Sequence, residues 1–142
     1  LDAIRSEFAS TIDTLAIEDL SKHIILTSSP FSRTLEAPAS LSLQMVEEEP
    51  DPKAFQSVPK TVGVLLEGTF VSDFKSRPVP DEISESVNVP AKSKPTKMVV
   101  VSDGDILKNQ VSSTDNSPFP LGYDRYTKQQ YGNLNFLLKS EQ

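Results

Sequence analysis

The sequence predicts an α/β fold: a layered sheet of about four strands, mostly central and buried, with flanking helices. The residues Met98–Val101 form an uninterrupted apolar, mostly β-branched run, which is typical of a strand covered on both faces. A second apolar run lies within Thr61–Phe70, and apolar residues at helical spacing occur near both ends of the chain. We expect this unit, residues 1–142, to be a single domain or part of a larger one.

The first two predicted elements are a helix and a strand. Between Ala3 and Leu15 apolar residues recur mostly every three or four positions without Pro or Gly, which predicts a helix over Leu1–Leu20. The apolar run within His23–Ser29 ends at hydroxyl residues and Pro30, which predicts a buried strand.

Three further elements follow in the middle of the chain. Apolar and polar residues alternate over Ala39–Val46, which predicts a half-exposed strand near a sheet edge. Asp51–Phe55 is compatible with a short helical turn that carries Pro at its first position. Thr61–Phe70 is predicted to be a buried strand, in which Gly63 indicates a close backbone contact.

The last part of the chain contains a long loop, a strand and two helical stretches. Lys75–Thr96 is rich in Pro, Ser and charge, and is predicted to be a mobile surface loop of about 20 residues. Met98–Ser102 is the third central strand, together with those at 23–29 and 61–70. The turn at Asp103–Asp105 then leads into a helix, and Gln130–Lys139 forms a closing helix.

Composition limits the classes of partner. The chain has 142 residues, no Cys and a net charge of −6, which argues against nucleic acid and anionic membrane surfaces as partners. No apolar run approaches the roughly 18 residues that span a bilayer, and no signal peptide is present. Because the chain begins at Leu1 without Met, we expect a piece of a longer protein.

Polar residues follow the predicted strands at their carboxyl ends, where open α/β sheets bind ligands. We therefore expect these residues to form a partner or ligand surface, although turn chemistry would also explain them. They are Ser28, Ser29, Arg33, Glu67, Asp103 and Asp105.

The residues suited to chemistry have simpler structural roles. Asp103 and Asp105 could hold Mg²⁺ or Ca²⁺, but Asp beside Gly is more often a helix cap or turn former. His23 is the only His, and without Cys it cannot form a usual zinc site. The chain has neither a G-x-S-x-G elbow nor a glycine-rich phosphate loop. We predict no catalytic residue, no cofactor and no metal.

Several blocks of the sequence carry a family resemblance: Leu1–Ile4, Thr11–Leu15, Thr27–Arg33, Leu65–Phe70, Phe74–Pro78, Val100–Asp105, Leu121–Asp124 and Tyr131–Asn133. Together they resemble the C-terminal part of the extracytoplasmic region of the GldG family. Its members are gliding-motility-associated auxiliary or substrate-binding proteins of ABC transporters in Bacteroidetes-type bacteria.

The resemblance implies a membrane-anchored parent chain on the periplasmic face of the inner membrane, working with an ATPase and a permease. It implies a non-enzymatic module that engages partner proteins. One alternative is a module of the same transporter that binds a small solute, and another is a degenerate hydrolase-like domain, which fold analogy alone supports weakly. The family provides no settled catalytic residues to transfer to this chain.

Overall fold

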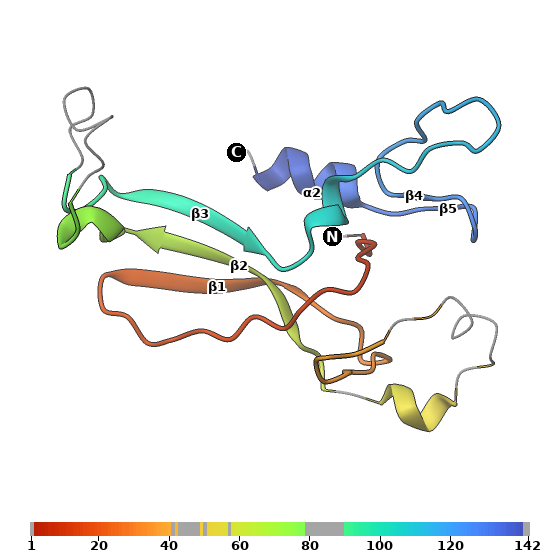
Figure 1. Cartoon of the computed structure of the whole chain (residues 1–142), viewed down its shortest axis with the longest axis horizontal. Helices are drawn as coiled ribbons and strands as arrows, with labels where there is room; N and C mark the ends of the chain where they lie inside the picture. Colours follow the sequence, from red (N-terminus) through yellow and green to blue (C-terminus); the bar gives the residue numbers. More distant parts are fainter. Residues whose placement is uncertain are drawn as a thin grey trace.

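The computed structural model describes residues 2–40, 42, 49, 51–56, 58–78 and 90–140. Helix and sheet are combined, as the sequence predicts, in a small mixed fold (Figure 1). The elements in order, with η for a 3-10 helix, are β1 (Leu20–Thr27), η2 (Pro52–Phe55), β2 (Thr61–Gly68), η3 (Asp73–Lys75), β3 (Thr96–Val101), η4 (Gly104–Leu107), β4 (Tyr123–Asp124), β5 (Gln129–Gln130) and α2 (Asn133–Ser140).

Among the described residues the main sheet has three strands in the order β1-β2-β3, and both pairings are antiparallel. All three predicted strands exist, but only β2 is central, so the prediction that all three are central and buried is wrong. Consecutive antiparallel strands are joined without a helical crossover, and between β1 and β3 the helices that the structure describes are the short 3-10 turns η2 and η3. Met98, Val99 and Val100 of β3 are accordingly exposed.

The predicted close contact at Gly63 is confirmed. A Cβ atom added there would lie 3.0 Å from Cβ and Cδ1 of Leu26 on the neighbouring strand. Leu26 reaches this position because the register of β1 shifts on both sides of it, between Ile24 and Leu26 and again before Thr27. A side chain at position 63 would therefore collide with the irregular part of β1.

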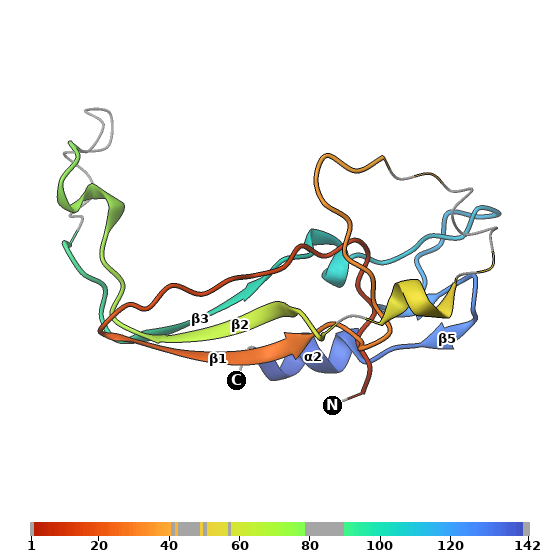
Figure 2. The ribbon, with the colours of Figure 1, turned by 90° about the horizontal axis from the view of Figure 1, so that it is seen from below.

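The N-terminal segment is extended, so the predicted helix over Leu1–Leu20 is wrong. Residues 2–18 contain no helix and run along the sheet before turning into β1 (Figures 1 and 2). The Ile12 N–H donates to the Thr61 carbonyl oxygen at 2.8 Å, and the Ser10 N–H donates to that of Ser102 at 3.4 Å. These tertiary partners replace intrahelical hydrogen bonds and override the helical spacing of the apolar residues.

The short elements follow the sequence more closely. The predicted turn at Asp51–Phe55 is η2, whose cap is the Asp51 carboxylate, accepting from the Lys53 N–H at 3.0 Å. The helix after β3 is the single 3-10 turn η4, and the closing helix is α2.

Two predictions fall largely on undescribed residues. The Ala39–Val46 strand lies, apart from residues 39, 40 and 42, outside the described part of the chain. Residues 79–89 of the predicted loop also lie outside it. At the base of that loop Val71 and Lys92 form an isolated β-bridge, which shows that residue 92 pairs with the chain leaving β2.

The apolar core is small. Among the described residues, the buried apolar side chains are Val64, Ile106 and Phe136. Ile24, Val64 and Val100 form a row across the three strands, because both Ile24 and Val100 are paired with Val64. Val64 is 3 % exposed, but Ile24 and Val100 are 62 % and 37 % exposed. The sheet therefore buries its centre and leaves apolar edges open.

Candidate functional site

The antiparallel sheet divides the predicted surface between its two ends. β1 and β3 both pair with β2, so they run in the same direction and their carboxyl ends meet at one end of the sheet. The residues that follow these two strands, Ser28, Ser29, Arg33, Asp103 and Asp105, lie at this end. Glu67 lies at the opposite end, because β2 runs the other way. The sequence prediction assumed strands with one common direction, and the structure does not bring Glu67 to the other five.

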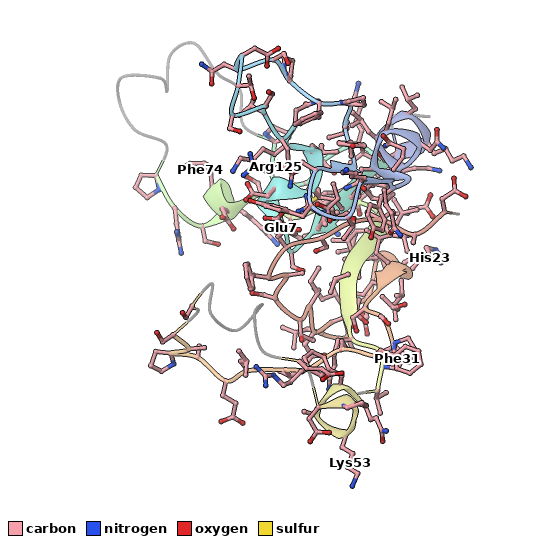
Figure 3. All side chains as sticks on the ribbon, turned by 90° about the vertical axis from the view of Figure 1, so that its right-hand side faces the viewer. Glu7, His23, Phe31, Lys53, Phe74 and Arg125 are labelled. Carbon is pink, nitrogen blue, oxygen red and sulfur yellow. The ribbon has the colours of Figure 1, made fainter. Side chains whose placement is uncertain are left out.

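The loop after β1 is organised by its own hydroxyl groups. The Ser28 hydroxyl oxygen accepts from the Lys60 N–H at 2.9 Å and lies 3.2 Å from the hydroxyl of Ser32. The Ser29 hydroxyl oxygen accepts from the Phe31 N–H at 3.0 Å, and the Phe31 ring projects outward (Figure 3). These serines therefore shape the loop in the way that turn chemistry predicts.

A hollow of about 830 Å³ lies between the N-terminal segment and the sheet. Leu26, Val62 and Val101 contribute apolar walls from the sheet side, and Ser28 and Arg33 lie at its polar part. Its volume is within the range of roughly 300–1,000 Å³ that small-molecule pockets occupy. Arg33 has a second neighbour, since its guanidinium carbon lies 5.4 Å from the centroid of the Phe55 ring.

Asp103 has a structural position at the same end of the sheet. One carboxylate oxygen accepts from the Asp105 N–H at 2.8 Å, which confirms the prediction that Asp103 caps the following helical turn. The other oxygen accepts from the Ser6 hydroxyl at 2.7 Å and the Glu7 N–H at 2.8 Å. Asp103 is 7 % exposed, and both oxygens of its carboxylate accept hydrogen bonds, one from the cap and the other from the N-terminal segment.

The two aspartates therefore differ. Asp105 is exposed and its carboxylate lies 3.4 Å from the Lys108 ammonium group. Burial raises the pKa of the Asp103 carboxyl group, but hydrogen bonds from Ser6, Glu7 and Asp105 and the charge of Arg5 outweigh burial, and the pKa is lowered overall. Asp103 is thus held as a carboxylate.

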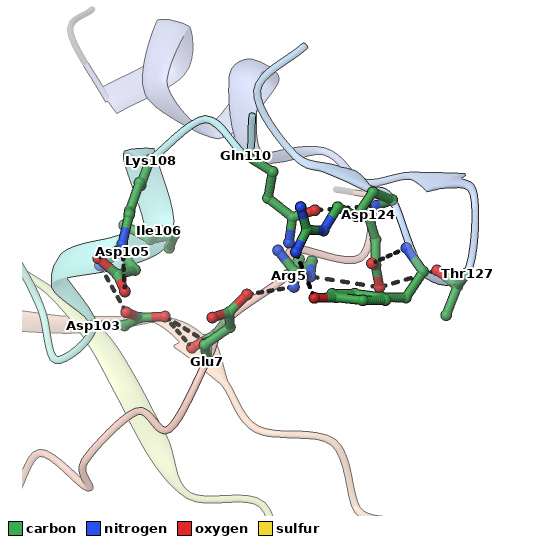
Figure 4. Close-up of polar contacts among 12 residues, drawn as sticks. Arg5, Glu7, Asp103, Asp105, Ile106, Lys108, Gln110, Asp124 and Thr127 are labelled. Carbon is green, nitrogen blue, oxygen red and sulfur yellow. Dashed lines mark hydrogen bonds and ion pairs between the residues drawn. The ribbon is translucent and has the colours of Figure 1, made fainter. Parts of the chain in front are cut away.

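Sequence reasoning missed a second group of buried polar residues. Asn133 is 3 % exposed, and its side-chain amide accepts from the Arg5 N–H and donates to the carbonyl oxygens of Arg5 and Ile106, at 3.0, 2.8 and 2.9 Å. The Arg5 guanidinium pairs with Glu7 and lies 3.6 Å from Asp124 (Figure 4). The N-terminal segment is thus fastened to the last third of the chain.

Asp124 is held in a similar way. Its carboxylate accepts from the Tyr126 N–H at 2.9 Å and the Thr127 hydroxyl at 3.0 Å. The Tyr126 N–H lowers the pKa of Asp124 most, burial opposes it, and Thr127 and Arg5 lower the pKa further. Together Asp103, Asp124 and Asn133 form what we call the N-terminal clamp. Asp124 and Asn133 end two of the GldG-like blocks, which is the signal that could have identified them.

Glu67 belongs to a row of ionisable side chains across the opposite end of the sheet. Its carboxylate lies 2.9 Å from the Lys97 ammonium group and 3.4 Å from Nε2 of His23, one partner on each neighbouring strand. The Lys97 hydrogen bond and charge lower the pKa of Glu67. In the described part of the chain no three His, Cys, Asp or Glu side chains group so that they could hold a metal ion.

The family model described as an ABC-type uncharacterized transport system matches residues 1–140. The chain belongs to this ABC transporter auxiliary family. It is therefore an auxiliary component of an ABC-type transport system. No curated protein and no solved structure matches the chain. None of the helices that the structure describes has the length and apolar content of a membrane span.

Proposed function

We propose that this auxiliary component is a non-enzymatic module that binds protein partners of the transport complex. The observation that carries the proposal is the open sheet, whose apolar row ends in the exposed side chains of Ile24 and Val100. Scattered exposed apolar residues are ordinary, but apolar side chains grouped on one sheet face mark protein contacts.

The resemblance to GldG supplies the finer part of the proposal. In this account the parent chain is anchored in the inner membrane, and the module faces the periplasm and serves gliding motility. Its partners are the ATPase and permease subunits, contacted directly or through the parent chain. The loops with Ser28, Ser29, Arg33 and Asp105, at one end of the sheet, border the proposed contact surface.

The experiment is co-purification of the tagged protein from membranes of its own cells. Ile24→Asp places a charge on the open sheet, while Leu15→Asp is the matched control on the N-terminal segment, because both side chains are largely exposed. Circular dichroism must first show that each variant folds as the wild type does. We expect Ile24→Asp to lose the ATPase and permease subunits and Leu15→Asp to keep them. Full retention by both variants would contradict the proposal.

The hollow beside the loop after β1 favours a second candidate function, the binding of a small solute. Its apolar walls and polar part have the character of a ligand pocket. Arg33→Glu reverses the charge there, and Arg125→Glu is a control at an arginine that does not line the hollow. A solute that raises the melting temperature of the wild type and of Arg125→Glu, but not of Arg33→Glu, would favour this function over protein binding.

A further inference from the structure

The two outer edges of the main sheet, with which no other described strand pairs, differ in regularity. Along β1 the register shifts twice, and such irregularities hinder the addition of another strand. Along β3 the pairing with β2 runs without a shift from Gly68 opposite Thr96 to Gly63 opposite Val101. The residues Thr96–Val101 contain neither Pro nor Gly. The outer edge of β3 therefore carries neither a bulge nor a Pro, and Lys97 is the one charged residue along it.

The direction of the β3 backbone groups follows from one hydrogen bond. The Ser102 N–H donates to the Val62 carbonyl oxygen at 3.0 Å, so Ser102 faces β2. Because antiparallel residues alternate, the N–H and C=O groups of Lys97, Val99 and Val101 point away from β2. Within the described residues, no other segment donates to or accepts from these outward groups. Another extended backbone would satisfy all of them at once.

The side chains along this edge define the chemistry of the added strand. Val99 and Val101 present an apolar surface on the same face as Lys97. The Lys97 side chain is 72 % exposed and pairs with a single carboxylate among the described residues, that of Glu67. An ammonium group can bind a second carboxylate, so the edge favours an acidic residue opposite Lys97 and apolar residues opposite the two valines.

We propose that the outer edge of β3 binds an extended strand of a protein partner by β-strand addition. The partner strand is apolar opposite Val99 and Val101 and acidic opposite Lys97. This inference rests on the proposed protein-binding function and assigns it to one edge of the sheet. Main-chain hydrogen bonds supply affinity, and the alternating side chains supply specificity.

The first test uses the chain itself and a synthetic peptide, acetyl-Thr-Val-Thr-Val-Thr-Glu-Thr-amide. Two control peptides have the same sequence with N-methyl groups on alternate amides. One control blocks the N–H groups on one edge of the peptide strand, and the other blocks those on the opposite edge. We expect the amide NMR signals of Lys97, Val99 and Val101 to shift with the first peptide, and not with the N-methylated version that blocks the binding edge. Shifts confined to β1, or no shifts at peptide concentrations up to solubility, would overturn the proposal.

Three variants test the backbone and the side chains of this edge separately. Val99→Pro removes an outward N–H and spares the bonds to β2, and we expect binding about tenfold weaker, as for one or two lost hydrogen bonds. Val99→Lys is the alternative should the Pro variant fail to fold. Lys97→Glu should reverse the preference toward a peptide with Lys in place of Glu. An unchanged affinity in both Val99 variants would overturn the assignment to this edge.

Co-purification separates this inference from the proposed function. Loss of partners in Ile24→Asp with full retention in Val99→Pro and Val99→Lys would keep protein binding and reject the β3 edge. Retention in all three variants would reject both. Sedimentation tests whether a second copy of this chain occupies the edge. A wild-type dimer that Val99→Pro converts to a monomer would show that it does, and would overturn the assignment of a different protein partner.

Discussion

The side-chain amide of Asn133 brackets the backbone of Arg5, accepting from its N–H at 3.0 Å and donating to its carbonyl oxygen at 2.8 Å. This pair joins residues 128 positions apart in the sequence. It fixes the direction in which the N-terminal segment enters the fold, and the same amide also holds η4 through the Ile106 carbonyl oxygen.

Asn133→Ala should release the N-terminal segment. The substitution removes the partner of a buried carbonyl group of Ile106 and of partly buried backbone groups of Arg5, so we expect the free energy of unfolding to fall by about 2 kcal/mol. Hydrogen exchange of the amides of residues 3–7 should become faster. Asn109→Ala is the matched control, because its amide makes one exposed hydrogen bond, to the Phe119 carbonyl oxygen. An equal fall in the free energy of unfolding of the two variants would show that Asn133 stabilises the fold no more than an exposed asparagine does.

Asp103→Ala and Asp105→Ala should differ clearly in urea unfolding. Asp103→Ala removes a cap, which typically costs about 1 kcal/mol, together with the bonds to Ser6 and Glu7. Asp105→Ala removes only an exposed ion pair and should stay within about 0.5 kcal/mol of the wild type. If instead both variants unfold at the wild-type midpoint and calcium or magnesium stabilises the wild type, the two residues form a metal site.

Acid should weaken the clamp. The pKa values of Asp103 and Asp124 are lowered in the folded chain, so their carboxylates stabilise the fold above the unfolded pKa of about 3.9. This stabilisation is lost as the pH falls through the lower folded values. We expect a nearly constant free energy of unfolding from pH 7 to about 5 and a decline below about pH 4. In Asp103→Asn the free energy of unfolding should decline less steeply with falling pH. A decline as steep as that of the wild type would show that the Asp103 carboxylate does not cause the acid sensitivity.

Gly63→Ala should destabilise the sheet, because the new methyl group would meet Leu26 at 3.0 Å. Overpacking of this kind typically costs about 1–3 kcal/mol. Gly104→Ala is the control, since a Cβ atom there has no neighbour within 4 Å. Thermal unfolding should show a lower midpoint for Gly63→Ala alone. A similar midpoint for both variants would mean that the sheet accommodates a methyl group beside Leu26.

The sequence predicts the strands of this fold better than their arrangement. Apolar runs locate β1, β2 and β3, because each run is a local property of the chain. The direction of β2 and the exposure of β3 depend on long-range pairing, which local patterns do not encode. The N-terminal helix is wrong for the same reason, since the partners that keep this segment extended, among them Thr61, Asp103 and Asn133, lie roughly 50 or more positions away.

The sequence correctly groups most of the candidate surface residues at one end of the sheet but misplaces Glu67, and the strand directions explain both results. Residues after β1 and β3 meet at one end because two strands on either side of a common antiparallel neighbour run the same way. Glu67, on that neighbour, necessarily lies at the other end. Arg5, the ion-pair partner of the clamp residue Asp124, was missed because a charged pair between distant segments leaves no local pattern around Arg5. For Asp124 the available signal was its place at the end of a GldG-like block.

Hydrogen exchange at the outer edge of β3 tests most directly whether a protein partner of the transport system binds this edge. The outward amides of Val99 and Val101 should exchange rapidly in the isolated chain, since no described segment pairs with them. In the complex assembled with the transport subunits, we expect both amides to become protected, while the exposed amides of the turn at Thr114 keep their rate. Exchange of Val99 and Val101 that is equally fast in the isolated chain and in the assembled complex would contradict binding at this edge.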